Sequence, residues 1–322
     1  MIRVGLDIHE SILGLPPEGS QRLIRRVAES ELDFVVVGDH VSFHGGQGFD
    51  GIVSATLALS AHPTLPVLIA VYQLALRHPL AVARQLSSIA QVAPGRLVLG
   101  VGAGGEDRQE VVNSGVDPKT RGRRLDEAIQ VLRLLATGEP VTCDRGFFHL
   151  EGALVLPVPS PPIPLVVGGS SEAALKRVAR LGDGWLPMFV SPRRFRDSVG
   201  KIADMAASAN RRLVLGPTLS VWCGLDADYG RARALLGRAL ERLYALPYEE
   251  FRNLTFAGSP RDVAESLLPY VEAGCRDFSL LVVAETWEAG IDLAAEVRHH
   301  LIKRAGPVRP QSSRGAVLDS RH

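Results

Sequence analysis

Short apolar stretches that alternate with amphipathic ones constrain the fold of this 322-residue chain more than any other feature. We expect eight strands, at residues 2–7, 34–37, 66–72, 96–101, 163–167, 184–188, 213–223 and 277–283. Strands that alternate with helices form parallel sheets, and eight such units favour closure into an α/β (β/α)8 TIM barrel. An open doubly wound sheet is the alternative.

The composition shows no break that would divide the chain into two domains. We therefore expect a single domain over residues 1–305, followed by a polar, flexible C-terminal tail at 306–322. Residues 141–162 hold a Pro-rich passage without clear periodicity, so we interpret them as an irregular insertion after the fourth strand of the barrel.

Charge and cysteine content narrow the classes of partner. The net charge is +1, and no basic arm with interleaved aromatics is present, so we expect no nucleic-acid partner. The three cysteines, Cys143, Cys223 and Cys275, fit no metal-ligand spacing, and we expect no metal site. Neither a charged-then-apolar leader nor an apolar run of roughly 18 residues is found, so we expect a cytoplasmic protein without a membrane partner.

Unusual side chains follow the predicted strands, at the end of a barrel where active sites lie. Asp39 and His40 follow the second strand. Candidate substrate-pocket residues at other strand ends are Asp7, His9, Trp185 and Trp222. Each also has an ordinary structural interpretation: the histidine as a satisfied strand-end residue, the aspartate as a helix cap, the tryptophans as core.

Two glycine-rich turns follow the fourth and fifth strands. Gly100, Gly102 and Gly105 formally match a dinucleotide fingerprint, but a basic run at 120–124 stands where that motif requires an acidic residue. We interpret this turn as backbone offered to some other ligand. The turn at 168–171, Gly-Gly-Ser-Ser before a helix, suits a phosphate dianion; a plain capped turn is the alternative.

The order of these motifs resembles the luciferase-like monooxygenase superfamily, particularly its deazaflavin (coenzyme F420)-dependent oxidoreductases. The matching pieces span about residues 2–190: 28–29 through Val37-Gly38-Asp39-His40, Arg77-His78-Pro79 with 83–85, 95–104, 121–127, Gly146-Phe147-Phe148, 164–170 and Arg180-Leu181-Gly182-Asp183-Gly184-Trp185. The resemblance implies a bacterial-luciferase-like TIM barrel with the cofactor ring across the strand ends.

The resemblance also implies roles for particular residues. Gly102, Ala103 and Gly104 match the turn that contacts the ring, and Gly168, Gly169 and Ser170 the turn that holds the cofactor phosphate. The non-prolyl cis peptide that backs the ring in many deazaflavin-binding members falls at Ala70-Val71. His40 matches a histidine that lies close to the ring and acts in proton transfer or in stabilising charge, and Asp39 would orient it or contact substrate. Gly105 departs from the family, which often has an aromatic residue there.

Three functions follow as hypotheses. The first is a coenzyme F420-dependent oxidoreductase that transfers hydride between the cofactor and a small organic substrate. The second is an FMN-dependent monooxygenase of the same superfamily, which would consume oxygen and need a separate reductase partner. The third is a flavin-binding barrel without turnover. The substrate, the reaction direction and the oligomeric state stay open, with a homodimer as one option.

Overall fold

The computed structural model describes residues 1–8, 15–104, 107–144 and 146–306, and it contains a parallel sheet curled into a barrel. The strands are β1 (Arg3–Asp7), β2 (Phe34–Val37), β3 (Val67–Tyr72), β4 (Leu97–Val101), β7 (Leu165–Gly168), β8 (Gly184–Leu186), β9 (Thr218–Leu225), β10 (Phe256–Gly258) and β11 (Asp277–Val283). Their order in the sheet is β10-β9-β11-β1-β2-β3-β4-β7-β8.

The barrel closes between β8 and β9. The N–H of Ser220 donates to the carbonyl of Pro187 at 2.9 Å, and Met188 and Ser220 form a parallel bridge. Eight strands therefore complete the ring, which confirms the predicted TIM barrel. The additional short strand β10 pairs with the last three residues of β9, Cys223 to Leu225. The sequence-based prediction missed β10.

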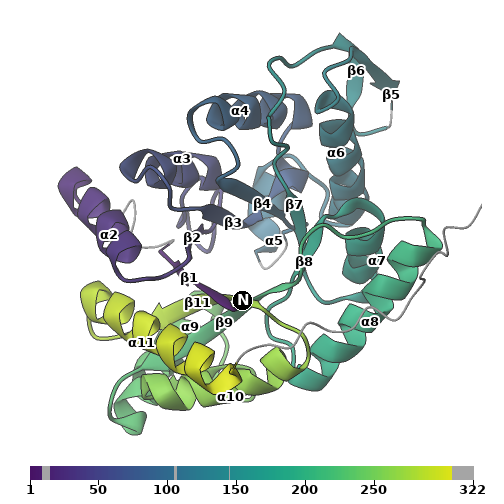
Figure 1. Ribbon diagram of the computed structural model, residues 1–322. Helices are drawn as coiled ribbons and strands as arrows, with labels where there is room; N and C mark the ends of the chain where they lie inside the picture. The colour runs from purple at the N-terminus through teal and green to yellow at the C-terminus, as the bar shows by residue number, and fades with distance from the viewer. Residues whose placement is uncertain (9–14, 105–106, 145, 307–322) are drawn as a thin grey trace, which may run out of the picture.

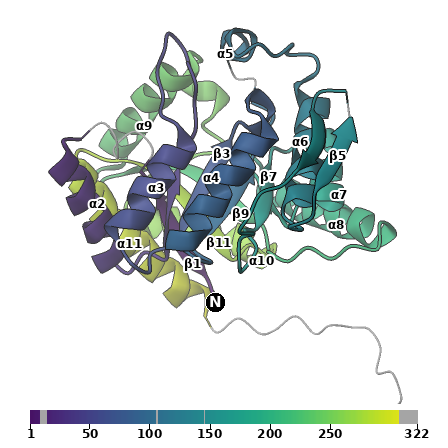
Figure 2. The ribbon, with the colours of Figure 1, turned by 90° about the horizontal axis from the view of Figure 1, so that it is seen from above.

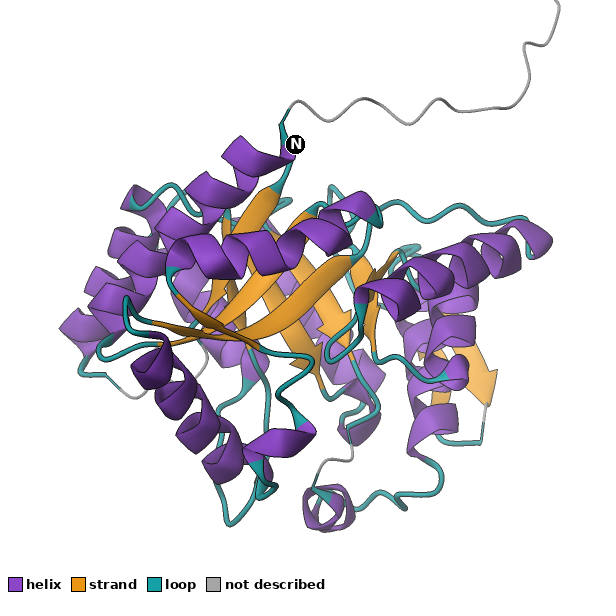
Figure 3. Cartoon of the chain, turned by 90° about the horizontal axis from the view of Figure 1, so that it is seen from below, coloured by secondary structure: helices purple, strands orange, loops and turns teal. Residues whose placement is uncertain are grey.

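Helices surround the strands, as Figure 1 shows in a view that runs nearly along the barrel axis. They are α2 (Pro17–Glu29), α3 (Gly51–Ala61), α4 (Pro79–Val92), α5 (Arg108–Asn113), α6 (Arg121–Leu135), α7 (Glu172–Leu181), α8 (Pro192–Ser208), α9 (Tyr229–Tyr244), α10 (Pro260–Glu272) and α11 (Trp287–Ala305). Figure 3 shows the helices outside and the strands within. The short helices η1 (Leu74–Leu76) and η2 (Tyr248–Glu250) lie in connections.

Two hydrophobic layers explain why the strands are apolar on both faces. Phe34, Val36, Leu68, Val166 and Leu186 fill the barrel interior. The alternate residues of the same strands join the larger core between sheet and helices. Because successive side chains of a strand point to opposite faces, one parallel strand supplies both layers.

Two predicted segments differ from the structure. The insertion at 141–162 is not irregular throughout, because β5 (Val141–Asp144) and β6 (His149–Ala153) pair as an antiparallel hairpin. The predicted strand at 213–223 begins only at Thr218, since the N–H groups of Val214 and Leu215 both donate to the carbonyl of Asp183. The predicted tail, from residue 307 onward, lies outside the described residues.

The carboxyl ends of the strands open on the face opposite the N-terminus. Figure 2 shows α5 and α9 on this face, beyond the ends of the barrel strands. The close approach of α9 is visible at Gly224 in β9, where a β-carbon would lie 2.2 Å from the carbonyl oxygen of Ala232. This face collects the residues discussed next.

Candidate functional site

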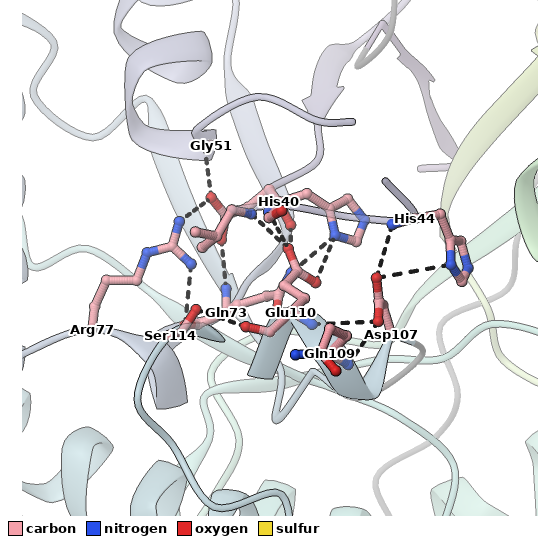
Figure 4. Close-up of polar contacts among 12 residues, drawn as sticks. His40, His44, Gly51, Gln73, Arg77, Asp107, Gln109, Glu110 and Ser114 are labelled. Carbon is pink, nitrogen blue, oxygen red and sulfur yellow. Dashed lines mark hydrogen bonds and ion pairs between the residues drawn. The ribbon is translucent and has the colours of Figure 1, made fainter. Parts of the chain in front are cut away.

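The core of the candidate site is a polar contact between His40 and Glu110 (Figure 4). His40 follows β2, and Nδ1 of its ring lies 3.3 Å from Oε2 of Glu110 on α5. The side chain of Gln73, which follows β3, lies against both, with Nε2 3.0 Å from His40 Nδ1 and 3.1 Å from Glu110 Oε2. An imidazole beside a buried carboxylate can accept a proton and remain stabilised as a cation.

Glu110 is 1% exposed and is held as a carboxylate by several donors. Its Oε1 accepts from the N–H groups of Val41 at 2.6 Å and Ser42 at 3.0 Å. Burial works against ionisation, but the Ser42 N–H, the amide of Gln73 and the Val41 N–H outweigh it and keep the pKa of Glu110 below its usual range. The site therefore carries a fixed negative charge beside His40.

Asp39, predicted as catalytic, lies in a structural network behind His40. Its carboxylate accepts from the N–H of Gly51 at 2.9 Å, the N–H of Gln73 at 2.8 Å and the guanidinium of Arg77 at 2.7 Å. Burial raises the pKa of Asp39 above its ordinary value, opposed by Arg77 and the two N–H groups. These contacts join the end of β2 to the beginnings of α3 and η1, so Asp39 positions the backbone that carries His40.

The segment 41–49 forms a loop beside His40. The Phe43 ring stacks on the His40 ring at a centroid distance of 4.1 Å, and its centroid lies 4.0 Å from that of the His44 ring, which is tilted against it. The N–H of His44 donates to Asp107, the N-cap residue of α5, at 2.8 Å, so the loop is attached to α5. A cavity of about 600 Å³ adjoins this loop and is lined by residues that include His40, Asp50, Arg77 and Ser114.

An apolar ledge lies on the neighbouring strands, where the resemblance implies a cofactor ring. The Ala70-Val71 peptide bond is cis, as implied by the resemblance, and both residues are half-buried on the inner face of β3. Val71 is held between two glycines: a β-carbon on Gly102 would lie 2.5 Å from Cγ2 of Val71, and one on Gly168 would lie 2.8 Å from Cγ1. These glycines therefore make room for Val71.

The rest of the fourth-strand turn is shaped by Gln73. Ala103 is half-buried and packs against the core, whereas Gly104 is exposed with φ of +66°. A β-carbon on Gly104 would lie 2.7 Å from Oε1 of Gln73. A residue with a side chain would be strained in this conformation and would collide with the amide, so glycine is required at this position.

The turn at residues 168–171 forms a separate polar region over the N-terminus of α7. Gly169 has φ of +102°, Ser171 caps α7 by accepting from the N–H of Ala174, and Arg194 of α8 donates to the carbonyl of Ser170 at 2.9 Å. A cavity of about 310 Å³ beside the turn is lined by residues that include Ser170, Arg194 and Lys201. Backbone donors with nearby cations suit a phosphate group.

The structure places the four predicted substrate-pocket residues differently. Asp7 is the half-buried last residue of β1, and His9 lies outside the described residues. Trp185 is 1% exposed, packs on Phe195 and donates its indole N–H to the carbonyl of Gly169, so it supports the turn from the helix side of the sheet. Trp222 is half-buried and faces inward, where its indole N–H contacts the hydroxyl of Tyr244 at 3.3 Å.

Gln73 and Glu110 were not identified from the sequence. Glu110 lies in a short polar helix and is separated from His40 by 70 residues, so no local spacing pattern connects the two. Gln73 lies between the third strand and an Arg-His-Pro motif without a pattern of its own. A weak signal is the apolar residue directly after Glu110: Val111 is buried, whereas Val112 is 46% exposed, so the side of α5 that carries Glu110 and Val111 faces the protein.

This parallel barrel carries a histidine, a buried glutamate and a glycine-flanked ledge at the carboxyl ends of its strands. These are features of a barrel that binds a ligand at that face. The family model described as luciferase-like monooxygenase matches residues 3–240. The chain therefore belongs to the luciferase-like monooxygenase family, as predicted from its motifs.

Within the described residues, no helix has the length and apolar character needed to cross a membrane.

Curated relatives match part of the chain. An uncharacterized protein of Mycobacterium tuberculosis is 34% identical over 172 residues, covering 49% of this chain and 58% of the relative. The F420-dependent glucose-6-phosphate dehydrogenase of Nakamurella multipartita is 31% identical over 160 residues, covering 48% and 47%. The F420-dependent hydroxymycolic acid dehydrogenase of M. tuberculosis is 29% identical over 209 residues, covering 62% and 57%. The chain thus spans about half the length of the curated relatives it matches.

Solved structures match nearly the whole chain. An F420-dependent secondary alcohol dehydrogenase, in complex with an F420-acetone adduct, has a TM-score of 0.80 at 20% identity and covers 94% of this chain and 99% of its own. The monooxygenase RslO1 of Streptomyces bottropensis has the same TM-score at 18% identity, with 95% and 100% covered. At these identities the likeness establishes the shared fold.

Proposed function

We propose that this protein is a coenzyme F420-dependent oxidoreductase that removes hydride from an alcohol. The observation that carries the proposal is the contact of His40 with Glu110 and Gln73 next to the ledge of Ala70 and Val71. The relatives named F420-dependent dehydrogenases support the choice of cofactor. A small-molecule alcohol is the corresponding partner.

The residues of the ledge and of the 168–171 turn fit such a cofactor. Ala70 and Val71 present a small apolar surface that a flat ring can cover, because Gly102 and Gly168 add no side chains around it. Gly169, Ser170 and Arg194 would hold the phosphate. When bound, the deazaflavin supplies a two-electron hydride acceptor.

The chain's own residues account for the proton that leaves with the hydride. Oxidation of an alcohol to a ketone releases one hydride and one hydroxyl proton. His40 takes the proton, and the carboxylate of Glu110 stabilises the resulting imidazolium. Asp39 and Arg77 hold the backbone of His40 in place from behind.

The FMN-dependent monooxygenase is the second candidate, supported by the equal structural likeness to a monooxygenase. Titration of the apoprotein with F420 and with FMN, followed by fluorescence, separates the two. We expect saturable binding of F420 and its reduction by a secondary alcohol without oxygen consumption. Tight binding of FMN alone, with oxygen uptake, would contradict the proposal.

The histidine distinguishes an enzyme from a barrel that only binds the cofactor. We expect His40→Ala to leave the Kd for F420 nearly unchanged and to lower kcat at least about 100-fold, the lower range for loss of a general base. His299→Ala, an exposed change on α11, is the matched control and should behave like the unmodified protein. Unchanged turnover in His40→Ala would remove this residue from the mechanism. A cytoplasmic location, a homodimer and a separate reductase stay predictions.

A further inference from the structure

The amide nitrogen of Gln73 faces more hydrogen-bond acceptors than it can serve. Nε2 lies 3.0 Å from the carbonyl oxygen of Asp39, 3.0 Å from Nδ1 of His40 and 3.1 Å from Oε2 of Glu110 (Figure 4). A primary amide has two hydrogens. One hydrogen is donated to the carbonyl oxygen of Asp39, which can only accept. The second hydrogen can be donated either to His40 or to Glu110, but not to both.

The orientation of this amide is fixed by its surroundings. Gln73 is 3% exposed, and its own N–H donates to the carboxylate of Asp39 at 2.8 Å. Its Oε1 is buried and has no hydrogen-bond partner among the described residues. A flipped amide would place this oxygen against the Asp39 carbonyl and the Glu110 carboxylate, which are acceptors only. The nitrogen must therefore face them, even though the oxygen is left unsatisfied.

Two hydrogen-bond arrangements satisfy the same geometry. In the first, His40 carries its proton on Nε2, and Nδ1 accepts the second amide hydrogen of Gln73. In the second, His40 carries a proton on Nδ1 and donates it to Glu110 Oε2 at 3.3 Å, while Gln73 also donates to that oxygen. Only the second arrangement leaves Nε2 of neutral His40 able to take a proton from an alcohol. In the first, Nε2 already carries the ring proton, so neutral His40 cannot act as a base there.

We propose that Gln73 is a positioning residue that keeps both proton arrangements of His40 accessible, by moving its amide hydrogen between His40 Nδ1 and Glu110 Oε2. The proposal rests on the proposed function, since it assigns His40 to proton exchange with the substrate. It adds that Gln73 sets the share of neutral His40 that can act as a base, because an amide hydrogen on Nδ1 holds the ring proton on Nε2, whereas one on Glu110 Oε2 leaves the ring proton on Nδ1.

The other charged groups around His40 are already paired. The Glu110 carboxylate on α5 is the facing charge, and Phe43 of the 41–49 loop covers the ring. Farther out, Asp39 is paired with Arg77, and Asp107 accepts from the N–H of His44 and lies 3.8 Å from its ring. Nδ1 of His40 lies 3.0 Å from the Gln73 amide nitrogen and 3.3 Å from Glu110 Oε2, so removal of the Gln73 amide should leave Glu110 beside it.

The test compares Gln73→Leu with Gln109→Leu. The control removes an amide of the same size from α5, where Gln109 is exposed and contacts Asn113. Gln73→Met provides a second, unbranched replacement should the leucine variant fold poorly. Thermal unfolding and F420 binding first establish that each variant is folded.

The first measurement needs neither cofactor nor turnover. Nitrogen-15 NMR of histidine-labelled protein reports which ring nitrogen carries the proton, and the His40 signals are assigned by their loss in His40→Ala. We expect the unmodified protein and Gln109→Leu to show protonation shared between the two nitrogens. In Gln73→Leu or Gln73→Met the proton should move to Nδ1. The same pattern in all four proteins would overturn the proposal.

The second measurement is the pH profile of kcat/KM for oxidation of 2-propanol with F420. Without the amide, Glu110 alone stabilises protonation at Nδ1, so the acidic limb should move upward by about half to one pH unit. An unmoved limb would contradict the proposal. If the unmodified protein binds F420 but oxidises no alcohol, the proposed function fails, whereas the NMR result still decides the role of Gln73 in setting the proton position.

Discussion

At the scale of single residues, the site depends on two buried carboxylates with different tasks. Asp39 accepts from Gly51, Gln73 and Arg77, all of which are structural partners. Glu110 instead contacts the His40 ring and the backbone that follows it. The sequence drew attention to Asp39 because it precedes His40, but the two side chains have different partners: Asp39 is bound by Gly51, Gln73 and Arg77, and the His40 ring contacts Glu110. In the proposed reaction, these contacts make Glu110 the carboxylate that stabilises His40 when it takes a proton.

Removing the Asp39 carboxylate should therefore reduce stability before it affects chemistry. In Asp39→Ala the guanidinium of Arg77 and two N–H groups lose their partner, and we expect a loss of about 3–5 kcal/mol in the free energy of unfolding. Asp50→Ala, which removes the N-cap of α3 and a longer contact with Arg77, should cost about 0.5–2 kcal/mol. Urea unfolding measures both. Equal losses would contradict the assigned role.

Glu110 should make stability depend on acid pH. Its pKa is lower in the folded protein than in the unfolded chain, because the N–H groups of Val41 and Ser42 and the Gln73 amide outweigh burial. Its stabilising contribution is then fully present above the unfolded pKa and is lost as the pH falls through the folded value. Glu110→Gln should thus flatten the acid side of the stability curve, measured by urea unfolding from neutral to acid pH. A parallel curve for the variant would refute this.

At the scale of secondary-structure elements, the ledge is built by three neighbouring strands. Val71 of β3 lies between Gly102, which follows β4, and Gly168 of β7. In the sequence these glycines resemble ligand-binding turns, and their contact with Val71 could not be predicted, because it depends on the register of three strands. The structure shows that the protein's own packing already requires glycine at both positions, because a β-carbon there would collide with Val71.

A β-carbon at Gly102 should displace Val71. We expect Gly102→Ala to cost about 1–3 kcal/mol of stability, as overpacking does, and to weaken F420 binding. Val71→Ala in the same chain should recover most of the stability, because it removes Cγ2, the atom 2.5 Å from the added carbon. Gly200→Ala in α8, where a β-carbon meets nothing within 4 Å, is the control. Failure of the double variant to regain stability would show that another contact is responsible.

Some secondary-structure elements could be predicted from the sequence and others could not. The barrel strands and most helices follow from periodicity, since both faces of each parallel strand are buried and the helices are amphipathic. The hairpin of β5 and β6 lacks such a pattern because its strands are short and largely exposed. Trp185 shows a related limit: its strand is recognisable, but the sequence does not reveal that this residue faces α8 and not the interior.

At the scale of the whole molecule, the ring order divides the mouth of the barrel into two sides. β8 is four places from β2 in the closed ring, so Met188 and Phe189 lie opposite His40. β9 is four places from β3, so Trp222 lies opposite the ledge. Phe189, Trp222 and Tyr244 pack with Tyr248 and Phe251 into one aromatic cluster under α9. One side of the mouth is polar and the facing side is aromatic.

If the protein oxidises alcohols as proposed, this division predicts which alcohols it should prefer. If the substrate lies between the ledge and the aromatic cluster, its hydroxyl meets His40 and its remaining groups meet Trp222, whose half-buried ring faces inward. We expect Trp222→Ala to raise KM for 1-phenylethanol about tenfold, a loss of ~1.4 kcal/mol, and to change KM for 2-propanol much less. Tyr229→Ala, an exposed change on α9, should alter neither. An equal effect on both alcohols would place Trp222 outside the substrate site and leave it as a packing residue, because only a contact with the aryl group can distinguish the two substrates.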